Sequence, residues 1–498
     1  MSAKSLVSVR TALFALPSVA FFWLAACGGD GGGVGSSPPG DAFNFPVGLS
    51  VSPGGRALYV ANADFDLQYN AGTVMALDLV AIHAAAESAA AQPCALGRVP
   101  QGQTLGEQCA APASLVPFLR GSVQVGAFAA DVQVSNTGFV DARGNARRRL
   151  YVPVRGTTSL SWMDVGDDSA GGDPFQLDCG GARCDANHNA GNRADEPGNT
   201  RSITLPGEPT VLAQSSDGKM LVIGHVGDDK ASLMATGIAS GASPSLQFIL
   251  PGLKASVGGL AMLPASASAP GQDLLATTRS GGTVNKLRYV PDEASALQRP
   301  YLALSRSYAV AGTASGNDSR GIVVDPSARD ACVSVGGGAR CAELPMPVFV
   351  ANRSPASLLY GSLAPTRGGA GDELSFAGSL PLPVGPSRAY LAPIVDEQGL
   401  ARNRLFVVSF DASTIVVIDP ETLRTEGTIH TGRSPYTAAF DVFDPHGASE
   451  AAVRAGYRFA YVANFTQSFL QVVDLDRRSP TYLRVIYTLG TPHAPKGS

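Results

Sequence analysis

Basic and aromatic side chains recur at one kind of place in the sequence, directly after a short apolar segment. The basic ones are Arg155, His225, Arg279 and Arg353, and the aromatic ones are Phe410 and Phe465. Guanidinium groups hold carboxylates and phosphates, and aromatic rings pack against flat ligands. If the fold gathers these positions, they form an arc that binds an anionic or sugar-acid ligand. The alternative is that they are solvated loop residues, because sequence alone does not define the register of short strands to within one residue.

Oxygen-bearing side chains in the segment 185–196 follow the spacing of a calcium-binding loop. Asp185, Asn187, Asn189 and Glu196 take positions 1, 3, 5 and 12 of that pattern, in which the oxygen ligands converge on one hard cation. Ala190 departs from the pattern because the sharp turn at its position needs glycine, and Arg193 adds a positive charge at position 9. A Ca²⁺ site and an asparagine-rich loop that satisfies its own backbone therefore both remain open.

Motifs of the common enzyme classes are absent from the sequence. The six histidines are mostly isolated, and there is no CxxCH, GxSxG, HExxH or P-loop motif and no GxGxxG after a strand. No catalytic residue is assigned for this reason. The net charge of −4, from 37 Lys and Arg against 41 Asp and Glu, also gives no reason to expect a nucleic-acid partner.

The elements that must position these residues are copies of one short strand. Seven copies occur, at 58–62, 150–154, 220–224, 274–278, 348–352, 405–409 and 460–464. Each is followed by a turn and a second strand, and further strands precede or follow several pairs, as at 201–207. Four-stranded antiparallel units bury their faces by packing radially when they are repeated in this way. The sequence therefore predicts an all-β, seven-bladed β-propeller over residues 43–492, followed by a tail at 493–498.

Three strings carry a resemblance to a known repeat family. They are SPGGRALYVAN, STIVVIDPETL and GYRFAYVANFTQSFLQVVDL, and they resemble the YVTN-type propeller repeat. The resemblance is clear in the first, sixth and seventh blades, and it persists elsewhere as the rhythm of the strands. Propellers of related appearance include lactonases and quinoprotein dehydrogenases, so the resemblance leaves an enzyme open without supporting one.

The beginning of the chain has the features of a secretory signal, namely a basic start and an apolar run too short to span a membrane comfortably. The string LAAC, which ends at Cys27, resembles the bacterial lipobox. This implies that residues 1–26 are removed and that Cys27 is diacylated. Gly28 after the cysteine resembles sorting to the outer membrane. Residues 27–42 are then a flexible Gly/Ser/Pro tether, and acyl chains attach the protein to the membrane.

The six remaining cysteines fall in three close pairs. The pairs are Cys94 with Cys109, Cys179 with Cys184, and Cys332 with Cys341. An oxidising compartment would join them as local disulfides, although only proximity selects this pairing among the connectivities that six cysteines allow. A metal site at the second pair is the alternative, but the CxxC spacing of such sites is missing.

Three long segments are predicted to project from one face of the propeller. Residues 81–112 and 166–200 connect the third and fourth strands of the first two blades, and 332–341 lies between the first and second strands of the fifth. Elaborated loops on a rigid scaffold commonly carry recognition. We therefore expect a lipid-anchored binding or assembly module of the cell envelope, with an envelope protein as partner, at the periplasmic face or surface of the outer membrane. The alternative is a lactonase-like or quinoprotein-dehydrogenase-like enzyme acting on a small anionic or sugar-derived substrate at the channel mouth.

Overall fold

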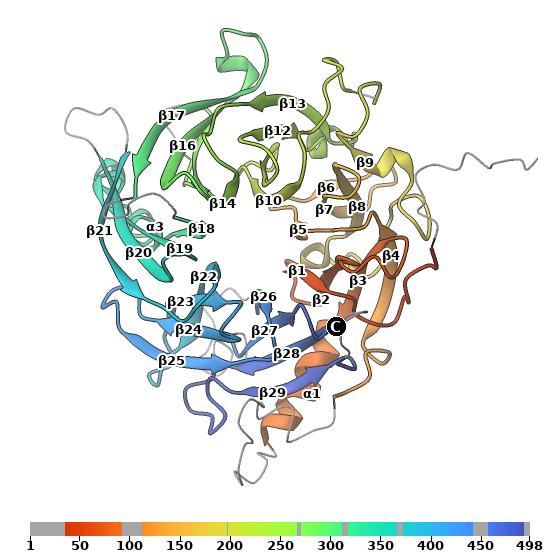
Figure 1. Ribbon diagram of the computed structural model, residues 1–498, viewed down its shortest axis with the longest axis vertical. Coiled ribbons are helices and arrows are strands. Elements are labelled where there is room, and N and C mark those ends of the chain that lie inside the picture. The colour runs from red at the N-terminus through yellow and green to blue at the C-terminus, as the bar shows by residue number, and fades with distance from the viewer. Residues whose placement is uncertain are drawn as a thin grey trace, which may run out of the picture. The chain divides into compact units, whose positions relative to one another are not determined.

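Seven antiparallel sheets surround a common axis, so the protein is a seven-bladed β-propeller (Figure 1). The computed structural model describes residues 35–91, 112–196, 198–265, 270–310, 317–365, 372–441 and 457–492. Strands that are consecutive in the sequence build each blade, with the first strand innermost and the last at the rim. The fold class predicted from the repeats is confirmed.

The strands succeed one another as follows. Blades one and two contain β1 (Pro46–Val51), β2 (Ala57–Asn62), β3 (Gly72–Asp78), β4 (Leu119–Val125), β5 (Gln133–Val134), β6 (Phe139–Val140), β7 (Ala146–Val154), β8 (Ser159–Gly166) and β9 (Asn189–Ala190). Blades three and four contain β10 (Pro209–Gln214), β11 (Met220–His225), β12 (Ala231–Ala235), β13 (Ser245–Leu250), β14 (Val257–Met262), β15 (Gln272–Thr278), β16 (Thr283–Val290) and β17 (Tyr301–Ala309). Blades five and six contain β18 (Ser319–Val324), β19 (Met346–Asn352), β20 (Ser357–Pro365), β21 (Asp372–Pro381), β22 (Pro386–Val395), β23 (Ala401–Ser409), β24 (Thr414–Ile418) and β25 (Thr425–His430). Blade seven contains β26 (Pro435–Phe440), β27 (Phe459–Asn464), β28 (Phe469–Asp474) and β29 (Val485–Leu489).

The second strand of a blade is buried on both of its faces, which explains why it is an uninterrupted apolar run. In β2, Leu58 and Val60 enter the hydrophobic cluster shared with blade seven. Tyr59 and Ala61 enter the cluster shared with blade two. Successive side chains of a strand point to opposite faces, so β2 joins its blade to both neighbours.

Blade two differs from its predicted form. Residues 201–207, predicted to be its fourth strand, form no strand, and β9 pairs with β8 instead. The 166–200 segment, expected to project from a face, packs along the outer strand β4, where the Cys184 amide donates to the Gln124 carbonyl at 3.0 Å. The physical reason is that an edge strand exposes unpaired backbone groups, and this segment satisfies them.

Two of the three predicted disulfides are confirmed. Cys179 joins Cys184 with an S–S distance of 2.16 Å, and Cys332 joins Cys341 at 2.12 Å. The third predicted pair, Cys94 with Cys109, lies outside the described residues, as does Cys27.

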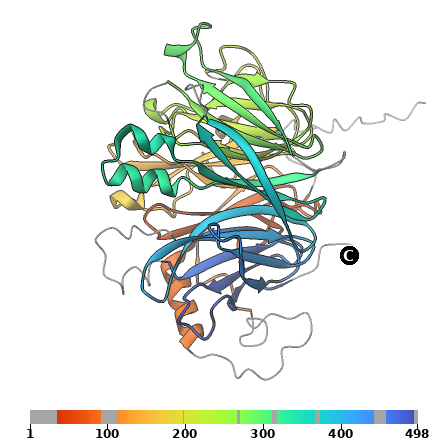
Figure 2. The same cartoon turned by 90° about the vertical axis from the view of Figure 1, so that its left-hand side faces the viewer.

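Two α-helices, α1 (Leu79–Ala91) and α3 (Ser327–Ser334), lie on one face of the ring (Figure 2). The repeat pattern predicts no helix at either place. Helix α1 opens the insertion after β3, and its composition is rich in alanine, the best helix former. The Asp78 carboxylate caps its start by accepting a hydrogen bond from the Ala81 amide at 3.0 Å. Within the described part of the chain, no helix combines the length and the apolar character needed to cross a bilayer.

Blade seven closes the ring with four strands of its own, without a strand from the other end of the propeller. Helix α1 covers the junction between blades one and seven, where Ile82 and Leu489 share one buried cluster. Beside it, the Ala113 amide donates to the Thr488 carbonyl at 2.9 Å. The ring is therefore fastened by elements that follow β3 and not by strand exchange.

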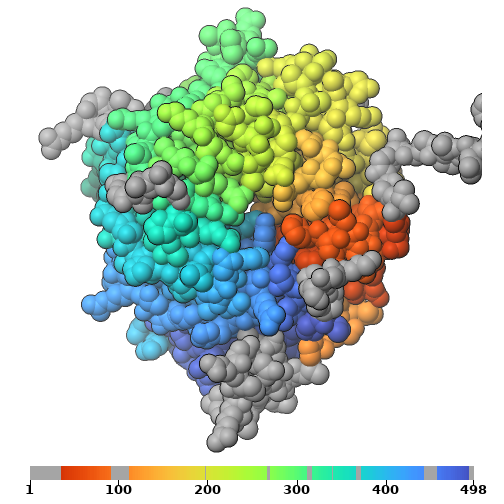
Figure 3. All heavy atoms as spheres, viewed as in Figure 1, coloured from red at the N-terminus to blue at the C-terminus, as the bar shows by residue number. Residues whose placement is uncertain are grey.

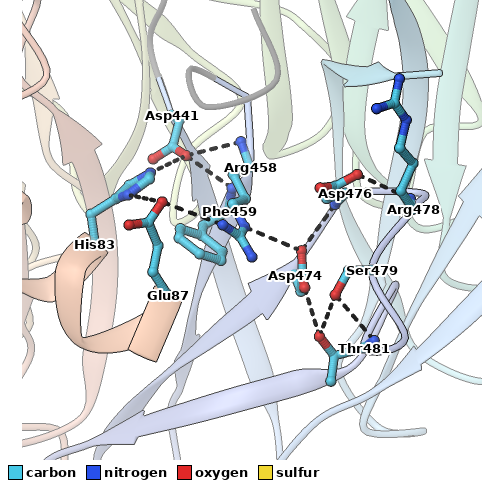
Figure 4. A network of polar contacts seen from close by, with 10 residues as sticks. All are labelled: His83, Glu87, Asp441, Arg458, Phe459, Asp474, Asp476, Arg478, Ser479 and Thr481. Carbon is cyan, nitrogen blue, oxygen red and sulfur yellow. Dashed lines mark hydrogen bonds and ion pairs between the residues drawn. The ribbon is translucent and has the colours of Figure 1, made fainter. Parts of the chain in front are cut away.

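A polar network spans the same junction (Figure 4). His83 of α1 lies 3.2 Å from Asp441, measured from Nε2 to Oδ2, and its ring packs edge-on against Phe459. Arg458 of blade seven donates to Glu87 of α1 at 3.3 Å. Asp441 also accepts a hydrogen bond from the Phe459 amide at 2.9 Å, so a single carboxylate links α1 to β27.

Candidate ligand-binding cavity

A cavity of about 500 Å³ opens at the centre of the face opposite the helices (Figure 3). Two sets of positions form its wall, the turns after the second strands and the first residues of the inner strands. The charged and aromatic residues of the wall are Arg155, Arg279, Arg320, Arg353, Arg388, Asp131, Phe65, Phe128, Tyr390, Phe410, Tyr436 and Phe465. The remainder is mainly aliphatic or glycine. This volume is typical of a site for one small organic molecule.

Three of the four basic residues predicted to form an arc lie together in this wall. They are Arg155, Arg279 and Arg353, and each follows the second strand of its blade. Phe410 and Phe465, predicted to stand beside them, line the same cavity. The structure thus gathers these side chains, while their role in binding a ligand stays a prediction.

His225 does not belong to the cavity. It is fully buried, and its Nε2 lies 2.8 Å from the Ser232 hydroxyl oxygen. The ladder pairs His225 with Pro209 just as it pairs Asn62 with Pro46 in blade one, so Val226 is the residue equivalent to the arginines. The predicted strand 220–224 ends one residue before β11 does, and a shift of one residue turns a side chain to the other face.

Two further arginines of the cavity, Arg320 and Arg388, come from the inner strands β18 and β22 and were not predicted. Six inner strands carry a break in register near their first residue, as between Ser319 and Ile322 and between Pro386 and Arg388. A β-bulge of this kind turns an extra side chain out of the ladder. Aligning the bulges of the inner strands is the sequence signal that could have found both arginines.

Four of the five arginines are paired with carboxylates at short distance. The pairs are Arg155 with Glu208 at 2.8 Å, Arg320 with Asp318 at 2.6 Å, Arg353 with Asp411 at 2.7 Å and Arg388 with Asp131 at 2.7 Å. Among the described residues, the one carboxylate near Arg279 is Asp318, which it shares with Arg320. The Nε of Arg279 lies 3.6 Å from Asp318, which already binds Arg320 through two hydrogen bonds. The five guanidinium groups of the wall therefore share four carboxylate partners, of which Asp131 itself lines the cavity.

The surroundings of Arg279 also disfavour its positive charge. Burial lowers its pKa, and the positive charge of Arg320 lowers it as well. Asp318 and Tyr436 act in the opposite direction but do not compensate. Among the described residues, none accepts a hydrogen bond from the Arg279 side chain. An anion placed beside this group would gain a partner that the fold does not supply.

One of the ion pairs crosses the channel. Arg388 belongs to blade six and Asp131 to blade two, with 257 positions between them in the sequence. Burial acts to lower the pKa of Arg388, but the charge of Asp131 outweighs it and raises the pKa well above its ordinary value. The guanidinium also lies over the ring of Tyr436, 5.2 Å from its centre. Arg388 is thus held by residues on opposite sides of the ring.

Aromatic rings form the other side of the cavity. Phe465 is central to them, with its ring centre 5.0 Å from Phe45, 5.3 Å from Phe65, 6.0 Å from Phe410 and 5.6 Å from Tyr436. Phe65 is 49% exposed although it is large and apolar. Together, Phe65, Phe410, Tyr436 and Phe465 are called the aromatic wall below.

The four residues of the predicted calcium loop are not gathered around one point. Asn187, Asn189 and Glu196 line a second, smaller cavity together with Arg193, and Asp185 is not among the residues that line it. Asp185 accepts hydrogen bonds from the backbone amides of Asn187 and His188, and Glu196 accepts them from Gly191 and Arg193. This geometry favours a loop that satisfies its own backbone, and calcium binding stays an untested prediction.

Comparisons with known proteins were made for the sequence and for the fold. No protein-family model matches the sequence, and no curated protein matches it. A hydrazine synthase from Kuenenia stuttgartiensis is similar in structure, with a TM-score of 0.45 and 12% identity over 87% of this chain and 97% of that chain. A candidate 6-phosphogluconolactonase from Bacteroides fragilis has a TM-score of 0.45 and 14% identity over 78% of this chain and 85% of that chain.

The propeller domain of Swd1 from Myceliophteria thermophila also has a TM-score of 0.45, with 9% identity over 86% of this chain and 96% of that chain. The likeness is one of fold. These similarities are too low to bear on what the protein binds or does. The resemblance to the YVTN-type repeat therefore stays a prediction.

Proposed function

We propose that the protein is a lipid-anchored, extracytoplasmic propeller that binds a small organic anion in the cavity at its channel mouth. The observation that carries this proposal is Arg279, a guanidinium without a carboxylate of its own inside a wall that otherwise pairs its charges. The Arg279 side chain is 29% exposed, and burying part of a cation without a hydrogen-bonded partner costs free energy. A bound carboxylate or phosphate would supply that partner.

The groups that face the cavity are suited to binding. They offer guanidinium donors for an anion and aromatic or aliphatic surface for the rest of a ligand. Asp131 is the carboxylate among the described lining residues, and it is bonded to Arg388. Proton transfer by Asp131 would require breaking that ion pair, so this carboxylate gives the enzyme alternative less support than the site gives binding.

Recognition of an envelope protein is the second candidate function, and it would use the helix-bearing face, opposite the cavity. Val333 and Val335 are 64% and 80% exposed in the segment closed by the Cys332–Cys341 disulfide. Apolar side chains held in the open by a constrained loop favour contact with another protein. Anchoring through Cys27 would present this face to other proteins of the envelope.

Thermal unfolding with and without anions tests the proposed function. We expect at least one of acetate, benzoate, gluconate and inorganic phosphate to raise the melting temperature of the full chain at pH 7, because a ligand that binds only the folded state stabilises it. Arg279→Gln should remove the shift. Arg306→Gln is the matched control, since Arg306 is an exposed arginine on the outer strand β17. If no anion shifts the wild-type protein, protein binding becomes the leading function.

A further inference from the structure

The polar groups of the cavity indicate what the body of its ligand is made of. Besides the ionised residues, the polar side chains among the described lining residues are Thr210, Ser387, Tyr390 and Tyr436. Three of their hydroxyls already have protein partners. Thr210 donates to the Gly224 carbonyl at 3.4 Å, Ser387 donates to the Val408 carbonyl at 3.3 Å, and Tyr390 lies 2.8 Å from the Thr437 hydroxyl.

Apart from the guanidinium groups, a hydroxyl-rich ligand such as a sugar acid therefore meets few polar side chains here. Each sugar hydroxyl that enters a cavity loses its hydrogen bonds to water, and an unreplaced bond costs free energy. The lining instead offers aliphatic side chains, such as Val47, Leu212 and Ile322, and the aromatic wall. A ligand with an apolar body loses no hydrogen bonds on entering such a site.

The rings of the aromatic wall pack against one another and against arginines. Tyr436 and Phe465 are stacked at 28° to each other, and Phe410 stands nearly edge-on to Tyr436 at 80°. Arg353 and Arg388 lie over the rings of Phe410 and Tyr436 at 5.9 and 5.2 Å. Guanidinium groups and aromatic faces are thus neighbours, and a ring with a negative substituent can meet both at once.

The aromatic wall comes from blades one, six and seven, and Arg279 follows β15 in blade four. It lines the same cavity as the aromatic wall, and the charges of Tyr436, Arg320 and Arg353 all act on it. A carboxylate bound to its guanidinium would therefore lie in the cavity that the aromatic wall also lines. The cation without its own carboxylate and the exposed aromatic surface belong to one site.

We propose that the ligand is an aromatic carboxylate, whose carboxylate binds Arg279 and whose ring packs against Phe410, Tyr436 and Phe465. This inference rests on the proposed function and makes it more specific. Small aliphatic anions and sugar acids would satisfy Arg279 alone and leave the aromatic wall in water. Neutral aromatic molecules would cover the wall and leave Arg279 without its partner.

Calorimetric titration of the full chain carrying Cys27→Ala tests this inference with four probes. They are 2-naphthoate, its neutral amide 2-naphthamide, gluconate and acetate. We expect 2-naphthoate to bind at least about tenfold more tightly than each of the others, because a charge-assisted hydrogen bond and a buried ring each contribute about that factor. Unlabelled protein and unmodified probes make the four dissociation constants directly comparable.

Two variants separate the contributions of charge and ring. Arg279→Gln should weaken 2-naphthoate about tenfold and leave 2-naphthamide unchanged. Phe465→Leu should weaken both aromatic probes severalfold and leave acetate unchanged. Arg306→Gln is the control for a lost arginine far from the cavity. Melting curves of all variants establish that each is folded before its affinity is compared.

The outcomes distinguish this inference from the function on which it rests. If gluconate or acetate binds as tightly as 2-naphthoate, the anion site exists and the aromatic inference is wrong. The inference is also wrong if Arg279→Gln leaves the affinity for 2-naphthoate unchanged. If none of the anions binds, the proposed function fails together with the inference.

Discussion

The last residue of each second strand is a buried polar position in most blades. Asn62, Asn352 and Asn464 occupy it in blades one, five and seven, and His225 occupies it in blade three. These side chains form hydrogen bonds to the next strand of the blade or to the turn that follows their own strand. For example, the Asn352 amide donates to the Pro355 carbonyl at 2.8 Å. In blade three the His225 imidazole makes the hydrogen bonds at this position, and unlike an asparagine amide it can be protonated.

His225 makes the stability of the protein depend on pH. Burial lowers its pKa from an ordinary 6.5 to about 4. Above pH 6.5 the imidazole is neutral in both the folded and the unfolded state, and its contribution is complete. Between pH 6.5 and 4 the unfolded state binds the proton first, so the free energy of unfolding falls as the pH falls, by about 3 kcal/mol in total.

Urea unfolding of the variant His225→Asn should not show this fall in the free energy of unfolding. Asparagine occupies the equivalent position in three other blades and does not titrate. Between pH 7 and pH 4 the wild-type protein should lose about 3 kcal/mol more than the variant. Burial raises the pKa of Asp64 to about 6, which acts in the opposite sense. Asp64 contributes equally to the stability of the wild-type protein and of the variant, so its effect cancels when the two free energies of unfolding are subtracted. Parallel stability curves for the two proteins would contradict the prediction.

The residues of the cavity show what the sequence can reveal at this scale. Arg155, Arg279 and Arg353 were found because each follows a recognisable apolar strand by one residue. His225 was assigned wrongly because the predicted strand stops at residue 224 and β11 ends at His225, and one residue decides between the cavity and the interior. Arg320 and Arg388 were missed because they sit at bulges, which the alternation of side chains does not reveal.

At the scale of elements, strands were predictable and their additions were not. A second strand that is buried on both faces is a continuous apolar run in the sequence. Its position can therefore be predicted even when its first or last residue is wrong by one. Helix α1 and the segment along β4 depend on tertiary contacts, because each covers a surface that another blade exposes. The error at 201–207 has the same origin, since Leu205 is buried there without joining a ladder.

Helix α1 gives the junction of blades one and seven its own stability, and a pair of matched substitutions can measure it. Ile82 of α1 and Ile223 of β11 are both fully buried. Replacing either by alanine should lower the free energy of unfolding by about 2–5 kcal/mol, because a large side chain leaves a cavity. Hydrogen exchange should differ between them. Ile82→Ala should speed exchange in α1 and β29, and Ile223→Ala should speed it in blade three. Equal protection of β29 in both variants would show that α1 does not hold the junction.

At the scale of the whole molecule, the number of blades can be predicted by counting strand pairs in the sequence. The residues that meet in the cavity cannot be predicted in this way. Side chains from six blades form its charged and aromatic wall, and the Arg388–Asp131 pair joins blades two and six. No local pattern relates positions so far apart in the chain. The closure of the ring was likewise open, because it depends on which elements meet at blades one and seven.

The described chain begins on the same face as the cavity, and this has a consequence if Cys27 carries acyl chains. The Asn70 amide donates to the Ser36 carbonyl at 3.1 Å, and its side chain donates to the Gly35 carbonyl at 2.9 Å. Asn70 lies in the turn between β2 and β3, which also contains Phe65 of the cavity. Residues 27–35 reach at most roughly 30 Å when fully extended. The cavity mouth would then face the membrane at short range.

Energy transfer from the protein to a labelled lipid headgroup measures this orientation. A donor fluorophore is attached to Leu67→Cys, 58% exposed beside the tether, or to Val335→Cys, 80% exposed on the helix-bearing face. We expect clearly stronger transfer from position 67 in vesicles that hold the lipidated protein, because the tether emerges next to it. The full chain with Cys27→Ala and either label should show no transfer above background. Equal transfer from the two positions would mean that the propeller turns freely on its tether, and ligands would then reach the cavity from the aqueous side as readily as from the membrane.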